Sequence, residues 1–277
     1  MHSQLSSHSA RAVTLGPLAA LCVDNGGPYV VLVPGFTGSK EDFAPILDPI
    51  AEAGFSPVAI DLPGQLDSPG PADEAAYFPE PLGRVVAELV SSLDRPVILL
   101  GHSYGGLVVR RALLQGAQVA GLTLLSSGPG ELPQGARRLV LDIGEPVVRA
   151  QGVVGAHRQM EVLNAANPRH QGLGDSVRTF LDARFLRNVP EALLGMSLGL
   201  RTEPDLVAEL RLALGGSPCV VACGVDDDAW PPVVQRDMAE RLDADFWVIR
   251  GAGHSPAVEN PEGLMEILLP TWKSWLG

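Results

Sequence analysis

The sequence predicts an α/β fold built on a mostly parallel, doubly wound sheet. Apolar strand-like runs alternate with helical patterns along the chain. At 96–115, a strand, a glycine-flanked turn and an apolar helix follow one another directly. A chain of 277 residues with 46% hydrophobic content can also bury a large core. We expect a core formed by residues 11–125 and 215–277. Residues 126–214 are predicted to form a helical cap inserted after the sixth strand, and residues 1–10 a flexible tail.

The predicted elements follow this alternation in chain order. An opening hairpin turns at Gly16-Pro17, and strand–helix units then repeat along the chain. Such units place parallel strands side by side, with the helices as crossover connections. The predicted strands lie at 12–15, 18–23, 29–33, 57–60, 97–100 and 119–125, and the predicted helices lie at 41–53, 82–93 and 107–114.

The segment around Ser103 has the pattern of a nucleophile on a tight turn. A buried strand leads through Gly101-His-Ser-Tyr-Gly105 into an apolar helix. The turn brings strand and helix so close that only hydrogen side chains fit at Gly101 and Gly105. The helix N-terminus points at Ser103, where its N–H groups and dipole favour a developing negative oxygen. We therefore predict Ser103 as a nucleophile, with a serine in an ordinary glycine turn as the alternative.

A serine hydroxyl needs a base to remove its proton, and His254 is the predicted base. In a doubly wound hydrolase sheet the partners follow in the order serine, acid, histidine, each after a later strand. Of the six histidines, only His254 follows such a strand candidate, at 245–249, and it stands in a glycine-containing loop. His102, beside the nucleophile, is expected to pack or to form hydrogen bonds. Activity should fall on acidification, as the imidazole is protonated.

The acid is predicted in the loop Gly224–Pro231, which follows a strand candidate at 218–223. Three adjacent aspartates compete for the role, and like charges raise one another's pKa unless each faces a different environment. Asp227 is the first choice, Asp228 the second and Asp226 the third. Asp228 also suits a helix N-cap. The triplet lacks convergent histidine or glutamate, so we expect no metal site.

These segments together resemble the α/β-hydrolase-fold serine hydrolases, in particular their capped esterase and haloperoxidase-like branch. Four segments in family order carry the resemblance: Val31–Ser39, the turn around Ser103, Gly224–Pro231 and Gly253–Pro261. The resemblance implies that Asp227, three residues after Gly224, is the acid. It also implies an oxyanion hole formed by the backbone N–H groups of Phe36 and Tyr104. The family commonly has His-Gly where this chain has Pro34-Gly35, which leaves the shape of the oxyanion loop open.

The cap is expected to set the substrate, because the core supplies only the reaction. Helical spacing recurs at 139–150, 176–185 and 190–200. Most apolar cap side chains should form the lid core, and the pocket candidates among them are Met160, Phe180, Phe185, Leu186, Leu194, Met196 and Leu198, joined by Trp230. One cap arginine could hold a substrate carboxylate, and the candidates are Arg158, Arg169, Arg178, Arg184, Arg187 and Arg201.

We therefore expect a serine hydrolase that cleaves an ester-type bond of a small, mainly apolar substrate through an acyl-enzyme, without metal or organic cofactor. Other reactions on the same fold remain open: those of a thioesterase, a carbon–carbon bond hydrolase, a cofactor-free haloperoxidase or perhydrolase, or a lyase. A ligand-binding protein with little turnover is the alternative from a different class.

Composition narrows the partners to a small-molecule substrate. A net charge of −12 without a basic cluster disfavours nucleic acid and anionic membranes. No run of eighteen apolar residues predicts a membrane span, and the first residues lack the basic and apolar regions of a signal peptide. Three cysteines cannot all pair, so reduced thiols are expected. These features favour a cytoplasmic location and leave the oligomeric state open.

Overall fold

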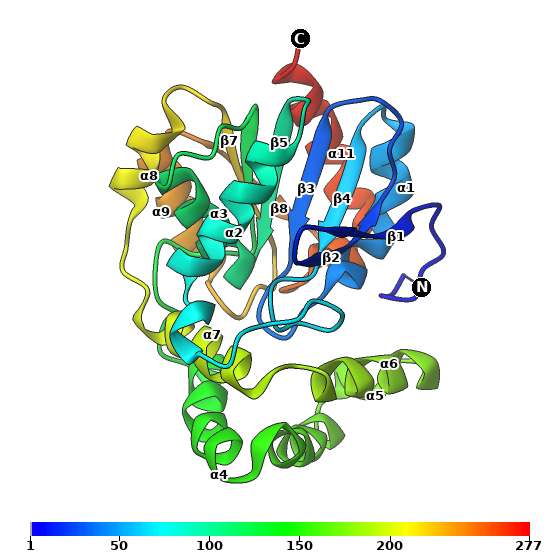
Figure 1. The fold of residues 1–277 in the computed structure, drawn as a ribbon, viewed down its shortest axis with the longest axis vertical. Helices are drawn as coiled ribbons and strands as arrows, with labels where there is room; N and C mark the ends of the chain where they lie inside the picture. Colours follow the sequence, from blue (N-terminus) through cyan, green and yellow to red (C-terminus); the bar gives the residue numbers. More distant parts are fainter. Residues whose placement is uncertain (1) are drawn as a thin grey trace.

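The computed structural model describes residues 2–277 and places one sheet between two layers of helices (Figure 1). The side chain of Arg169, one of the cap arginines considered above, lies outside the described part. In the sheet, the order is β1-β2-β4-β3-β5-β6-β7-β8. The strands are β1 (Arg11–Leu15), β2 (Leu18–Cys22), β3 (Tyr29–Val33), β4 (Ser56–Ile60), β5 (Val97–His102), β6 (Gly121–Leu125), β7 (Cys219–Gly224) and β8 (Asp245–Ile249).

The sheet is mostly parallel, which confirms the predicted fold class. The pairs from β4 through β8 are parallel, while β1 pairs with β2, and β2 with β4, in antiparallel fashion. Strand order reverses between β3 and β5, because β4 follows β3 on one side and β5 lies on the other. Ligand sites in such sheets form at the carboxyl ends of the strands beside this reversal. The loops after β3 and β5 therefore frame the site.

Helices cover both faces, so the central strands are apolar on both sides. Val31 and Leu99 belong to the core under one layer, and Val30 and Ile98 to the core under the other. This explains the continuous apolar strand runs of the sequence. One layer holds α2 (Pro79–Ser92), α3 (Tyr104–Leu114), α8 (Val207–Leu214) and α9 (Pro232–Leu242). The other holds α1 (Ala44–Glu52), α10 (Pro256–Glu259) and α11 (Pro261–Ser274), and short 3-10 helices lie at η1 (Lys40–Phe43) and η2 (Glu74–Tyr77).

Between β6 and β7, the described chain is helical and projects from the carboxyl end of the sheet (Figure 1). This part contains α4 (Ala136–Ala165), α5 (Pro168–Gln171), α6 (Asp175–Leu186) and α7 (Pro190–Thr202). α4 consists of two helical arms joined at Gly152, whose φ of 66° and ψ of −168° suit glycine. We call α4 to α7 the cap.

α8 lies inside the range 126–214 that is predicted as the cap, but it packs with the core. It packs against α3 and α9, and Val207, Leu210 and Leu214 join the main core. The predicted range 126–214 therefore includes one helix that belongs to the core layer. Helical spacing alone could not separate this helix from the cap, because both kinds of helix bury an apolar face.

Residues 2–10, predicted to form a flexible tail, lie against the core. Ser9 donates its N–H to Asp48 at 2.8 Å, and the Gln4 amide donates to Asp42 at 3.2 Å. Ala10 packs on the core beneath α1 and α11. The polar composition of this segment gave no sign of these contacts, because they depend on aspartates more than thirty residues away.

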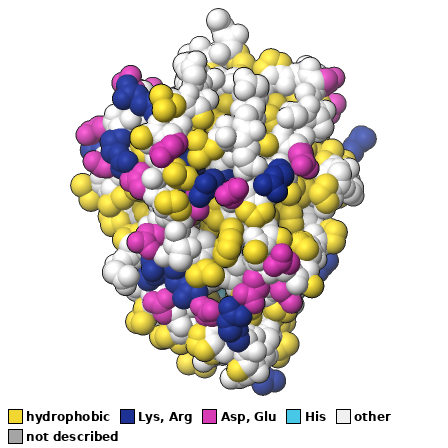
Figure 2. Space-filling view, turned by 60° about the vertical axis from the view of Figure 1, so that its left-hand side comes forward, with side chains coloured by type: hydrophobic (Ala, Val, Ile, Leu, Met, Phe, Trp, Pro, Cys, Tyr) yellow, Lys and Arg dark blue, Asp and Glu magenta, His cyan; other side chains and the backbone are white. Residues whose placement is uncertain are grey.

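The surface mixes both signs of charge. Figure 2 shows one face, on which basic and acidic side chains are interspersed and hydrophobic side chains also reach the surface. The three cysteines are free thiols. In the described residues, we find no helix with the length and apolar character needed to cross a bilayer.

Candidate active site

Ser103 stands on the turn between β5 and α3 in a strained backbone conformation, with φ 53° and ψ −119°. A Cβ on Gly101 would lie 2.4 Å from the Gly105 carbonyl oxygen, and a Cβ on Gly105 would lie 2.4 Å from the Val33 carbonyl oxygen. Neither position has room for a side chain. Tight packing of β5, α3 and β3 thus holds the Ser103 hydroxyl at the carboxyl end of the sheet, beside the reversal of strand order.

Three side chains from separate loops form one hydrogen-bonded chain. Ser103 Oγ lies 2.9 Å from His254 Nε2, and His254 Nδ1 lies 2.9 Å from Asp227 Oδ1. All three residues are buried. They follow β5, β8 and β7, whose carboxyl ends meet at one edge of the sheet. With its proton on Nδ1, the neutral imidazole donates to Asp227 and accepts from Ser103.

The three adjacent aspartates face different environments. Asp226 and Asp228 are exposed, and Asp228 pairs with Arg137 at 2.7 Å. Asp227 is buried, and besides His254 its carboxylate accepts hydrogen bonds from the Ala229 N–H and from the side chain of Gln235, at 3.0 and 2.9 Å. Burial opposes ionisation of Asp227, but these hydrogen bonds and His254 outweigh it and lower its pKa. Asp227 is therefore an acceptor that stays charged.

His102 connects the turn that contains Ser103 to the loop that contains His254. Its Nε2 lies 2.7 Å from the His254 carbonyl oxygen, and since a carbonyl only accepts, His102 Nε2 carries the proton and donates. Burial and the neighbouring His254 lower the pKa of His102 to about 4, despite this hydrogen bond. On the other side of the loop, Glu259 accepts from the N–H groups of Gly253 and Ser255, at 2.6 and 3.2 Å. His254 is thus held from two sides.

The loop after β3 approaches Ser103 closely. A Cβ on Gly35 would lie 2.9 Å from the Cβ of Ser103, and the next residue, Phe36, lines the same cavity as Ser103. Tyr104 is the first residue of α3, and an N–H in a first helical turn has no partner within the helix. The fully buried Gln65 donates to the Gly35 carbonyl at 2.7 Å and thereby fixes the loop that contains Pro34.

The sequence analysis did not single out Gln65 and Gln235, which hold the loop after β3 and the carboxylate of Asp227. Gln65 directly follows the Asp61-Leu-Pro-Gly64 segment, and its side chain also accepts from the Leu62 N–H at 3.1 Å. Gln235 lies on α9, eight residues after Asp227. Glutamines are mostly exposed, so neither position gave a sequence signal.

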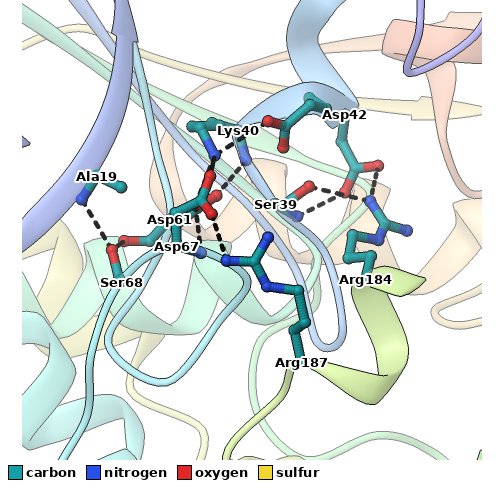
Figure 3. Close-up of polar contacts among 10 residues, drawn as sticks. Ala19, Ser39, Lys40, Asp42, Asp61, Asp67, Ser68, Arg184 and Arg187 are labelled. Carbon is teal, nitrogen blue, oxygen red and sulfur yellow. Dashed lines mark hydrogen bonds and ion pairs between the residues drawn. The ribbon is translucent and has the colours of Figure 1, made fainter. Parts of the chain in front are cut away.

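Ion pairs connect the segments around Asp42 and Asp67 to the cap (Figure 3). The buried Lys40 ammonium lies 2.8 Å from Asp61 and 2.7 Å from Asp67. Burial opposes the charge of Lys40, but its hydrogen bonds to these carboxylates outweigh this effect and raise its pKa. From α6, Arg184 contacts Asp42 at 2.6 Å, and just beyond it Arg187 contacts Asp67 at 2.7 Å.

A cavity of about 520 Å³ opens above Ser103 and His254, and we call it the catalytic pocket. Of the predicted pocket residues, Met160, Phe185 and Trp230 line it, and Leu194 lines a second cavity in the cap. Met196 is instead part of the main core. The charged side chains along the wall form two pairs of opposite sign, Arg137 with Asp228 and Arg184 with Asp42.

A mostly parallel sheet with a strained serine between a strand and a helix defines the class of α/β hydrolases. The chain belongs to the alpha/beta hydrolase family, whose model matches residues 30–267. This match confirms the resemblance drawn from the sequence. A similar curated protein is the 2-succinyl-6-hydroxy-2,4-cyclohexadiene-1-carboxylate synthase of Citrobacter koseri, 30% identical over 256 residues that cover 88% of this chain and 93% of that protein.

Solved structures with the same fold include proteins of several activities. A carboxylesterase structure from Nitrososphaera gargenis superposes with a TM-score of 0.77 at 19% identity and covers 98% of each chain. A bromoperoxidase from Bacillus anthracis has the same TM-score at 19% identity, with 96% of this chain and 100% of that chain covered. At such identities the likeness shows the fold, and the reaction has to be argued from the site.

Proposed function

We propose that this chain is a serine hydrolase that cleaves an ester-type bond of a small, mainly apolar substrate. The observation that carries the proposal is the buried hydrogen-bonded chain from Ser103 through His254 to Asp227, at the floor of a pocket whose wall mixes apolar and polar side chains. A nucleophile, a base within hydrogen-bond reach and a group that orients the base are the parts needed for acyl transfer.

In the proposed reaction, Ser103 Oγ attacks the ester carbonyl while His254 Nε2 accepts its proton. Asp227 holds the imidazole in the required tautomer and stabilises its positive charge. The backbone N–H groups of Phe36 and Tyr104 stabilise the oxyanion. His254 then gives its proton to the leaving alcohol. A water molecule, deprotonated by His254, attacks the acyl-enzyme and releases the carboxylic acid, which restores Ser103.

The charges of the catalytic pocket favour a neutral substrate. Arg184 and Arg137 could in principle bind a substrate carboxylate, but each already pairs with an aspartate of the same wall, Asp42 or Asp228. A guanidinium has donors for a second acceptor, but an incoming carboxylate would be repelled by the aspartate already paired with it. A neutral ester meets no such repulsion.

The second candidate function is the reaction of the curated relatives, the 2-succinyl-6-hydroxy-2,4-cyclohexadiene-1-carboxylate synthases. Identity of 30% over 88% of the chain favours it. Their named product carries a carboxylate and a succinyl group, however, and the paired arginines of this pocket speak against such a ligand. Titration of that compound into the Ser103→Ala protein separates the two candidate functions. Binding with a micromolar dissociation constant would favour the synthase reaction, and absence of binding up to millimolar concentration would favour ester hydrolysis.

Active-site labelling tests the proposed function directly. A fluorophosphonate should label the protein with one probe per chain, and Ser103→Ala should abolish labelling and lower kcat/KM for p-nitrophenyl butyrate by about 10⁴-fold or more. Parallel assays of acyl thioesters examine the thioesterase alternative. Absence of labelling and of turnover in the wild-type protein, shown by circular dichroism to be folded, would favour a ligand-binding role and contradict the proposal.

A further inference from the structure

The cap contains a second, largely apolar cavity of about 700 Å³. Both arms of α4 contribute to it, Leu139 and Ile143 from the first arm and Val162 from the second, and Leu193 and Leu194 of α7 close its base. Leu139, Ile143 and Val162 are each more than half exposed, so the cavity opens to solvent along α4. We call it the cap pocket.

The cap pocket adjoins the catalytic pocket. The two cavities share seven wall residues, all of them apolar: Phe36, Ala136, Val140, Leu141, Met160, Leu163 and Phe185. Phe36 belongs to the loop beside Ser103, and Phe36 and Phe185 also pack on the small hydrophobic cluster inside the cap. A chain attached to a carbonyl at Ser103 would reach the cap pocket by passing between these apolar side chains, and occupation of the cap pocket by a substrate chain requires such a passage.

The buried part of the wall offers few polar partners. The buried lining residues include Leu141, Val148, Ala156, Leu193 and Leu194, together with Ser197, whose hydroxyl has no hydrogen-bond partner among the described residues. Glu145 is paired with Arg149 and Arg201. An occupant rich in polar groups would lose hydrogen bonds to water here without replacement, whereas a hydrocarbon chain would lose none.

We infer that the cap pocket binds the hydrocarbon chain of the ester substrate, which makes the preferred substrates medium-chain rather than short-chain esters. The inference rests on the proposed function, since it places the ester carbonyl at Ser103. Each methylene that enters the pocket replaces contact with water by contact with Leu139, Ile143 and their neighbours on the wall. Burial of one methylene corresponds to about a three- to fourfold gain in binding.

Two series of compounds test the inference at concentrations below their solubility limits. In p-nitrophenyl acetate, butyrate, hexanoate and octanoate, kcat/KM should rise by about threefold per methylene until the pocket is filled. Ethanol, butanol, hexanol and octanol should inhibit hydrolysis of the acetate ester with inhibition constants that fall in the same way. A flat or falling dependence on chain length in both series would overturn the inference.

A matched pair of variants links the effect to the cap pocket. Leu139→Glu places a carboxylate on the cap-pocket wall, whereas Leu212→Glu makes the same change on α8, and neither leucine lines the catalytic pocket. The two leucines are 57% and 82% exposed, so both variants should fold. Leu139→Glu should lower the octanoate-to-acetate ratio of kcat/KM by about tenfold, and Leu212→Glu should leave it unchanged. Leu139→Met should keep the ratio.

The outcomes separate the inference from the proposed function. If the acetate ester is hydrolysed in a Ser103-dependent way but chain length has no effect, the proposed esterase function stands and the proposed role of the cap pocket is rejected. No ester turnover at all would remove the proposed function itself. Activity on octanoate that rises only above its solubility limit, with no gain for the dissolved ester, would point to a lipid surface as the occupant and would also overturn the inference. An equal loss of the ratio in both glutamate variants would do the same.

Discussion

The sheet-edge loops and the cap are the two halves of this site, and they are held by different forces. At the sheet edge, Ser103, Asp227 and His254 follow strands whose positions are fixed by parallel pairing, and hydrogen bonds from Gln65, Gln235 and other neighbours hold the loops. The cap joins the core through apolar side chains of α7, such as Met196 and Leu200, and through ion pairs, and its cavity is walled largely by apolar side chains. In the proposed function, precise polar geometry would serve the reaction at one half, and shape and hydrophobicity would serve substrate selection at the other.

The largest expected effect comes from the acid at the sheet edge. Asp227→Asn should lower kcat by about 10⁴-fold, because an amide in this place favours the wrong imidazole tautomer. Asp226→Asn and Asp228→Asn are matched controls, since both carboxylates are exposed, and each should stay within about threefold of the wild type. Steady-state kinetics with p-nitrophenyl butyrate measure all three. An equal loss in Asp228→Asn would mean that the reacting conformation uses a different acid.

The next effect concerns pH and the hydrogen bond of His102. Its pKa is lowered in the folded protein to about 4 from the ordinary value of 6.5, so the unfolded chain takes up a proton first as pH falls. His102 therefore contributes stability above pH 6.5 that is lost between about 6.5 and 4, and we expect a loss of about 2–3 kcal/mol. Urea unfolding at pH 7 and 4.5 measures it.

His102→Gln keeps an N–H donor near the His254 carbonyl and removes the titration, so the difference in unfolding free energy between the two pH values should shrink by most of this amount. His2→Gln is the control, because His2 is exposed. If both variants retained the pH dependence of the wild type, other groups would have to account for it.

The third effect tests how the cap is joined to the core. Arg184 and Asp42 are 12% and 17% exposed, whereas Arg187 and Asp67 are 56% and 41% exposed. Arg184→Met leaves a largely buried carboxylate without its cation and should cost about 2 kcal/mol of unfolding free energy. Arg187→Met should cost less than about 0.5 kcal/mol, as exposed pairs do. Equal losses in the two urea titrations would mean that burial does not govern these contacts.

The half of the site at the sheet edge was accessible from the sequence for a physical reason. Ser103, Asp227 and His254 each follow a short apolar strand, and parallel pairing brings the ends of such strands together regardless of their separation in sequence. The fold class could be predicted in the same way from alternating strands and helices. The roles of Gln65 and Gln235 could not be predicted, because nothing in the local sequence distinguishes a buried glutamine from an exposed one.

The cap was predictable as helices, but its cavity and its ion pairs were not. Helical spacing around 139–150 indicated an apolar face, yet the same pattern describes a packed lid core and the wall of an open pocket. The bend at Gly152 decides between them, since it separates the arms of α4, and one glycine in a helical pattern does not reveal its backbone angles. Likewise, the arginines gave no sign of which would pair with Asp42 or Asp67.

The smallest expected effects come from two glycines of α4, which test that bend. A Cβ on Gly144 or on Gly152 would meet no atom within 4 Å, so the two differ in backbone conformation and not in space. Gly144→Ala should raise the unfolding free energy by about 0.5–1 kcal/mol, as in other helix interiors. Gly152→Ala forces a φ of 66° and a ψ of −168° on alanine and should lower it by about 1–2 kcal/mol. Thermal unfolding measures both changes. Stabilisation by both alanines would mean that α4 runs straight through Gly152, and the cap pocket between its arms would then lose its geometric basis.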